Sequence, residues 1–233
     1  MSKRKLLTYL YFFLTLIDAL GVIYPLIIQR KYTTFLPIPT LLILYFYSVK
    51  KVNTLYVFSM LATFLGIIFL NIKGYFNIAL IFYAIGVFLY VVISLKTAEV
   101  IPIKTIIIAT IPFLIVYLVP LILYSDAVQI EVFNFIMIYV FCVGLFFFIT
   151  TLVYINKPNK INLWLLSSGV VFLISTIIHG YNLFFKFLIT IRVGVVITFL
   201  FMHYAMYKYI VLKAIENDRE IPSQKQQTSR LVK

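Results

Sequence analysis

The sequence predicts an all-α integral membrane protein, a bundle of eight transmembrane helices with both termini in the cytoplasm. Of the 233 residues, 64% are apolar and 12% are charged, and the mean hydropathy is +1.08, whereas soluble domains are about 45–50% apolar and about 25% charged. The apolar residues stand in uninterrupted runs, unlike the alternating pattern of a membrane β-barrel. The basic residues are distributed unequally between the two sides of these runs, as positive-inside topology requires.

Each predicted helix is an apolar run with few or no charged residues, and its length suits a membrane crossing of about 17–25 residues. In chain order the runs are 6–28, 33–49, 54–72, 75–95, 105–124, 132–155, 161–181 and 188–210. Short connections with charged residues, Gly, Pro or Asn separate them, such as the Lys157-Pro158-Asn159-Lys160 segment. Residues 1–212 are therefore predicted to form a single eight-helix membrane domain. The polar segment 213–233, rich in Gln, Ser and charge, is expected to be a disordered cytoplasmic tail.

The basic residues predict the orientation. Of the 20 Lys and Arg residues, fifteen belong to the N-terminus, to the second, fourth and sixth connections and to the C-terminal segment, and five belong to the other side. Because Lys and Arg accumulate on the cytoplasmic side, both termini are expected there, which requires an even number of crossings. The net charge of +13 is thus explained by topology, and no nucleic-acid partner is predicted. The expected location is the plasma membrane.

The chain start allows a second interpretation. Lys3-Arg4-Lys5 followed by an apolar stretch resembles a secretory signal with Ala19-Leu20-Gly21 as its cleavage site. Asp18 beside that site and the apolar residues that continue to Ile28 favour an uncleaved helix. The lone Cys142 lies within a predicted helix, so no intrachain disulfide or thiolate metal site is expected.

Ionisable residues at membrane depth are the first functional candidates, because a charge at the bilayer centre costs about 2.5–3.5 kcal/mol on the insertion scale. Asp18, His179, Arg192 and His203 qualify. Asp18 and His203 are expected at similar depths and would hydrogen-bond if their helices are neighbours. Alternatively, His203 extends towards the cytoplasmic headgroups and Asp18 bonds a nearby Tyr or Thr. The two histidines are expected on the order of 20 Å apart along the membrane normal, so no metal site or cofactor is predicted.

The seventh predicted helix carries a polar stripe. Ser168, Phe172, Ser175 and His179 share one face at helical spacing. Small hydroxyl residues on one face favour helix packing, and the alternative is that they face a substrate. Because Asp18 is the sole carboxylate within the predicted helices, no Ser-His-Asp triad is expected and the catalytic residues stay unknown.

Several short segments carry a family resemblance: residues 35–42 (FLPIPTLL), 65–67 (LGI), 82–90 (FYAIGVFLY), 169–176 (GVVFLIST) with Lys186-Phe187, and 204–211 (YAMYKYIV). In order and helix number they resemble the motifs of the lysoplasmalogenase (YhhN-type) family of eight-helix membrane proteins. The resemblance implies a hydrolase that cleaves the vinyl-ether bond of a lysoplasmalogen, with a lysophospholipid as its membrane partner. Such cleavage needs an acid and a base, a role suited to buried carboxylates.

The chain departs from that family where the chemistry is expected. By the resemblance, the family's two helix carboxylates fall on Ile67 and Thr176, and its helix-four histidine falls on Val87. The resemblance therefore predicts a diverged member that lacks the acidic residues. The candidate cavity-lining residues are Asp18, Gly66, Tyr90, Ser175, Thr176, His179, His203 and Tyr204.

Three functions follow from these observations. The first is a lysolipid ether hydrolase, or a derivative that binds a lysolipid without cleaving it. The second is a small proton-coupled transporter that uses Asp18. The third is a non-catalytic membrane partner or sensor, which the missing carboxylates favour.

Overall fold

The computed structural model describes residues 2–98, 102–125 and 128–231, and over these residues the chain forms helices and no strands. The helices are α1 (Lys3–Ile23), α2 (Arg30–Thr33), α3 (Pro37–Phe46), α4 (Thr54–Leu70), α5 (Phe76–Thr97), α6 (Ile103–Ser125), α7 (Ile130–Asn156), α8 (Lys160–Phe184) and α9 (Ile189–Leu231). The predicted connection 96–104 includes residues 99–101, which lie outside the described residues, as do residues 232 and 233 of the predicted tail.

Six of the described helices are long and apolar enough to cross a membrane: α1, α5, α6, α7, α8 and the Ile189–Asp218 part of α9. Helix α4 is apolar but shorter, with 17 residues. The ten residues of α3 extend about 15 Å at 1.5 Å per residue, half of a hydrocarbon core of about 30 Å. The chain therefore has the helices of a multi-pass all-α membrane protein, and crossing by all eight segments stays a prediction.

Prolines end or divide two of the predicted helices. The run predicted from residue 6 to 28 is helical only to Ile23, because the residue before Pro25 is driven away from helical backbone. The run predicted from 33 to 49 is also wrong as one helix. Helix α2 ends at Thr33, and α3 begins at Pro37, where a missing N–H costs nothing.

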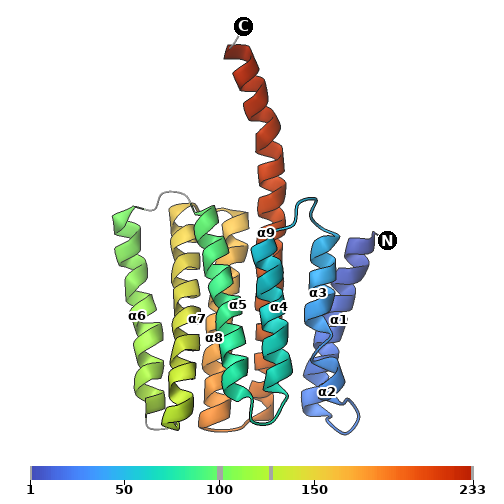
Figure 1. Ribbon diagram of the computed structural model, residues 1–233, viewed down its shortest axis with the longest axis vertical. Coiled ribbons are helices and arrows are strands. Elements are labelled where there is room, and N and C mark those ends of the chain that lie inside the picture. Colours follow the sequence, from blue (N-terminus) through green and yellow to red (C-terminus); the bar gives the residue numbers. More distant parts are fainter. Residues whose placement is uncertain (1, 99–101, 126–127, 232–233) are drawn as a thin grey trace.

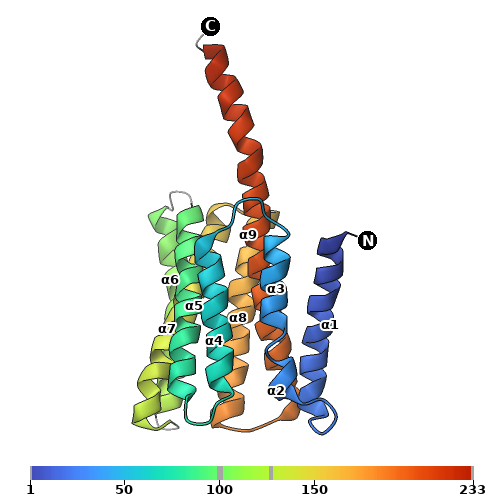
Figure 2. The same ribbon diagram turned by 45° about the vertical axis from the view of Figure 1, so that its right-hand side comes forward.

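The longer helices stand side by side around a common axis (Figures 1 and 2). Neighbours in contact are α3 with α4, α4 with α5, α5 with α7, α7 with α8, α8 with α9 and α9 with α3, so these six helices close a ring. Helix α1 packs outside the ring against α3 and α9, and α6 packs chiefly against α7. Apolar side chains on the outside of α6, such as Ile103 and Ile111, are 76% and 63% exposed, as is typical of a lipid-facing surface.

Both termini lie at the same end of the bundle, named the terminal end below (Figure 1). The opposite end carries the connections 24–29, 71–75 and 185–188 (Figure 1). Helix α9 continues past the terminal end to Leu231 without a break. A helix segment that leaves its packing partners depends on propensity alone, and disorder of residues 213–233 stays a prediction.

Large aromatic side chains fill the middle of the ring. Tyr56 of α4, Tyr90 of α5, Phe146 of α7 and Phe172 of α8 are at most 1% exposed. Tyr56 stacks on Tyr90, and the Phe146 ring meets both Tyr90 and Phe172. This packing closes the centre of the bundle and leaves space nearer the end opposite the termini.

Candidate functional site

A cavity of about 130 Å³ lies within the ring, near the end of the bundle opposite the termini. It is bounded there by Leu70, Phe76 and Phe184, which are the last residue of α4, the first of α5 and the last of α8. Its polar lining consists of Asp18, Arg30, Thr34, Tyr83, Tyr139, Ser175, Thr176, His179 and Arg192. Its apolar wall includes Ile67, Leu80, Ile136, Val140, Val195, Val196, Phe199 and Leu200.

Asp18 is the centre of the polar side of this cavity. Its Oδ1 accepts hydrogen bonds from Arg30 Nε at 3.2 Å, from the Thr33 hydroxyl at 3.0 Å and from the Thr34 hydroxyl at 2.7 Å. Its Oδ2 accepts one from Arg30 Nη2 at 3.2 Å. A buried carboxylate needs a paired charge and satisfied oxygens, and the segment around α2 supplies both. The pairing therefore folds residues 30–34 back over the end of α1.

Gly21 makes this return possible. A Cβ atom at this position would lie 2.8 Å from Cγ of Arg30 and 3.1 Å from Cγ2 of Ile28. The side chain of Arg30 thus crosses α1 directly over the glycine on its way to Asp18. Any larger residue at position 21 displaces the arginine from the carboxylate.

Arg192 brings a second guanidinium to the cavity from the first turn of α9, where its backbone N–H bonds the carbonyl of Leu188. It is close enough to Arg30 and Asp18 to interact electrostatically with both. Among the described residues no carboxylate forms an ion pair with Arg192. The charge of Asp18 is shared between two arginines, so the cavity carries an excess of positive charge.

Helix α8 contributes His179, Ser175 and Thr176. The Nδ1 atom of His179 is buried and has no hydrogen-bond partner among the described residues. The Ser175 hydroxyl is 3.5 Å from the Val195 carbonyl, and the Thr176 hydroxyl is 3.4 Å from that of Tyr139. Both contacts are longer than a well-formed hydrogen bond between oxygens, so these groups are free to bond a ligand.

Four of the eight residues predicted from the sequence meet at the cavity: Asp18, Ser175, Thr176 and His179. Gly66 lies behind the cavity wall and makes room there for the ring of Tyr83. A Cβ atom added to Gly66 would lie only 2.8 Å from that ring. The other three, Tyr90, His203 and Tyr204, are not part of the lining.

His203 lies in the aromatic core and pairs with Tyr90. Its Nδ1 is 2.9 Å from the Tyr90 hydroxyl, and the histidine is 1% exposed. The two arrangements considered for this residue, a bond to Asp18 and extension towards headgroups, are therefore both wrong. For Asp18, the expected bond to a threonine is present twice, but the ion pair with Arg30 was not foreseen. Tyr204 stacks on Tyr11 at a centroid distance of 5.9 Å.

Sequence reasoning missed Arg30, Thr33, Thr34 and Tyr83 as site residues. The prediction of a single helix over residues 6–28 places Arg30 in the following connection, away from Asp18. The signal that could have found it is Pro25, which ends α1 early and places Asp18 only five residues before the helix end at Ile23. A buried carboxylate so near a helix end is within reach of a cation in the next connection.

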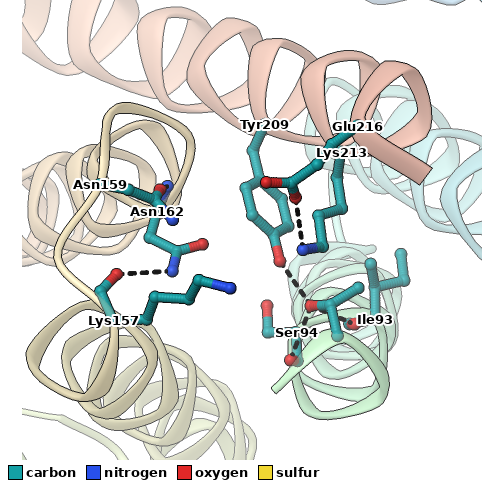
Figure 3. Close-up of polar contacts among 9 residues, drawn as sticks. Ile93, Ser94, Lys157, Asn159, Asn162, Tyr209, Lys213 and Glu216 are labelled. Atoms are coloured by element: carbon teal, nitrogen blue, oxygen red, sulfur yellow. Dashed lines mark hydrogen bonds and ion pairs between the residues drawn. The ribbon is translucent and has the colours of Figure 1, made fainter. Parts of the chain in front are cut away.

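The terminal end of the bundle is closed by polar contacts instead of an opening (Figure 3). Tyr209 of α9 hydrogen-bonds Thr97 at the end of α5, and Lys213 pairs with Glu216 at 2.6 Å. Between α7 and α8, Asn162 Nδ2 donates to the Lys157 carbonyl at 2.8 Å (Figure 3). The space at this cluster is about 10 Å³, close to that of a single water, so we assign it a structural role.

No protein-family model, curated protein or solved structure matches the chain.

Proposed function

We propose that this protein is a membrane receptor or carrier that binds a lysophospholipid in the cavity without hydrolysing it. The observation that supports this proposal is the position of Ile67 and Thr176. The resemblance to the lysoplasmalogenase family aligned these two residues, which lie on α4 and α8, with the family's carboxylates. Both line the same cavity, together with Ser175.

The lining of the cavity suits an amphiphile. Two arginines and Asp18 are its charged residues, hydroxyl groups and His179 add further polar atoms, and aliphatic and aromatic side chains form much of the rest. A cavity of about 150 Å³ holds a molecule the size of benzene. The cavity of about 130 Å³ is thus large enough for the phosphate of a lysolipid, and the rest of the molecule would lie outside it.

The residues of the cavity do not favour hydrolysis of an enol ether. That reaction needs a group that protonates the alkene and a base that positions water. Ile67 has no titratable group, and the Thr176 hydroxyl does not ionise at neutral pH. Asp18, the carboxylate among the described lining residues, is held by Arg30 and two threonines. Asp18 is thus engaged in holding Arg30 and α2 in place, which disfavours the proton-coupled transporter.

Direct binding tests this function. Purified protein in lipid nanodiscs is expected to bind a radiolabelled lysophospholipid saturably and to release no aldehyde from lysoplasmalogen. Replacing Thr176 with Trp fills the cavity, so binding is expected to weaken by at least about tenfold, or 1.4 kcal/mol.

The matched control is Ile177→Trp on the next residue of α8, whose side chain is 49% exposed on the outside of the bundle. This variant is expected to bind like the wild type. Absence of saturable binding, or an equal loss in both variants, would contradict the proposal. Aldehyde release by the wild type would show that the protein is a hydrolase.

We further propose that the terminal end faces the cytoplasm and the cavity end faces outward. The basis is the fifteen Lys and Arg residues assigned to the side of the termini against five on the other. A fluorescent protein fused at the C-terminus is expected to be fluorescent, and alkaline phosphatase at the same place to be inactive. The reverse pattern is expected for reporters inserted at the exposed Gly74 between α4 and α5. Phosphatase activity at the C-terminus would reverse the assignment.

A further inference from the structure

The charges that line the cavity determine which lysolipid head group it accepts. This inference rests on the proposed lysolipid binding. Phosphocholine and phosphoethanolamine head groups carry a cation, whose recognition calls for a carboxylate or a cage of aromatic rings. Asp18 is the carboxylate among the described lining residues, and its oxygens already accept four hydrogen bonds. The cavity therefore has no free carboxylate to offer to an ammonium group. Aromatic rings such as Tyr83 and Tyr139 also line it, but a cation beside them would be repelled by Arg30 and Arg192.

Donors for an anion are available in the same place. Arg192 forms no ion pair with a carboxylate of the described residues, although it lines the cavity with Arg30. A guanidinium presents five N–H donors in a planar fork that matches phosphate oxygens. The hydrogen bonds of Arg30 to Asp18 use its Nε and Nη2, which leaves Nη1 for another acceptor.

His179 adds a third group from α8, which packs against α9. Its Nδ1 is buried without a hydrogen-bond partner among the described residues, and its ring lines the cavity from α8 while Arg192 lines it from α9. A buried polar atom without a hydrogen-bond partner destabilises the protein. A phosphate monoester with a protonated oxygen, or with an oxygen that accepts from the imidazole, would satisfy this atom.

We propose that the cavity selects a lysolipid whose head group is a phosphate monoester, as in lysophosphatidic acid, and that Arg192 is its principal ligand. Two arginines against one carboxylate leave a net positive charge that a phosphate monoester neutralises and a zwitterionic head group does not. Arg30, positioned by Asp18, is the second contact. Arg192 thus determines head-group specificity, while the apolar wall contributes equally to every lysolipid.

The test compares ligands that share one acyl chain. Wild-type protein in nanodiscs of neutral lipid is titrated with lysophosphatidic acid, lysophosphatidylcholine and the free fatty acid, and separately with glycerol 3-phosphate. Lysophosphatidic acid is expected to bind at least about tenfold more tightly than each of the other three. The Arg192→Gln variant is expected to lose this preference. An unfolding temperature equal to that of the wild type checks that the variant is folded.

The control is Lys186→Gln, which removes an exposed cation at the same end of the bundle outside the cavity lining. It is expected to keep the preference, whereas an equal effect of both variants would mean that general surface charge is responsible. Equal affinity for the two lysophospholipids would overturn the head-group inference and leave lysolipid binding intact. Fatty acid binding as tight as that of lysophosphatidic acid would replace phosphate by carboxylate as the ligand. Equal binding of glycerol 3-phosphate would overturn the lipid function itself, and no binding of any ligand would overturn both.

Discussion

Replacement of Asp18 by leucine is expected to destabilise the protein by about 3–5 kcal/mol, because it leaves a partly buried guanidinium without its counter-ion. The side chain of Arg30 is 27% exposed and that of Asp18 is 4% exposed. Water can therefore solvate the unpaired guanidinium only in part. The loss extends further, since the hydroxyls of Thr33 and Thr34 lose the same acceptor. Arg30 and Arg192 would also face each other without a shared anion. The measurement is the free energy of unfolding in mixed detergent micelles.

Two further variants separate charge from packing at this site. Asp18→Asn keeps an oxygen for Thr34 but removes the charge, and it is expected to fall between the wild type and Asp18→Leu. The double variant Asp18→Leu/Arg30→Met removes both charges and is expected to recover most of the lost stability, because an apolar pair of similar volume replaces a buried ion pair at little cost. A double variant as unstable as Asp18→Leu would show that the charge of Arg30 is not the cause.

The second large effect is expected at the contact between α7 and α8. Gly169→Ala places a Cβ 2.2 Å from the hydroxyl oxygen of Thr150 and 3.1 Å from its Cβ. Thr150 is fully buried and bonds the Phe147 carbonyl at 2.9 Å, so the side chain has no free space into which to rotate. We expect a loss of about 1–3 kcal/mol from overpacking, measured by the same unfolding experiment. Small residues at such a contact allow two helices to approach closely.

Gly194→Ala on α9 is the matched control for this substitution. The nearest atom to a Cβ added there is Cδ1 of Ile178, at an ordinary contact distance of 3.6 Å. It is expected to be neutral or to stabilise the helix by up to about 1 kcal/mol, the propensity difference between the two residues. The pair Gly169→Ala/Thr150→Ala is expected to recover only part of the loss, because the 3.1 Å contact remains. Equal behaviour of the two single variants would contradict the packing argument.

The polar stripe on α8 shows how much of the candidate site can be predicted from residue spacing within one helix. Helical spacing placed Ser168, Phe172, Ser175 and His179 on one face, with packing and substrate contact as alternatives. Packing applies to the part of the stripe nearer the terminal end, where Ser168 donates to the Met202 carbonyl of α9 at 3.1 Å and Phe172 is buried in the core. Substrate contact by the other part stays a prediction. Ser175 and His179, nearer the end opposite the termini, line the cavity. Periodicity defines the face of a helix, but what occupies the space opposite each turn depends on the other helices.

The sequence by itself determined the membrane class and the helical content, because composition and uninterrupted apolar runs depend on the chain alone. It also singled out Asp18, since a carboxylate in an apolar run has to be compensated wherever the chain folds. The partner of Asp18 was decided by the tertiary structure: Pro25 ends α1, the chain returns over Gly21, and Arg30 reaches back to the carboxylate. The separation of His203 in the core from His179 at the cavity is likewise tertiary, because neither the neighbours of a helix nor the space left between side chains is encoded in the spacing along one segment.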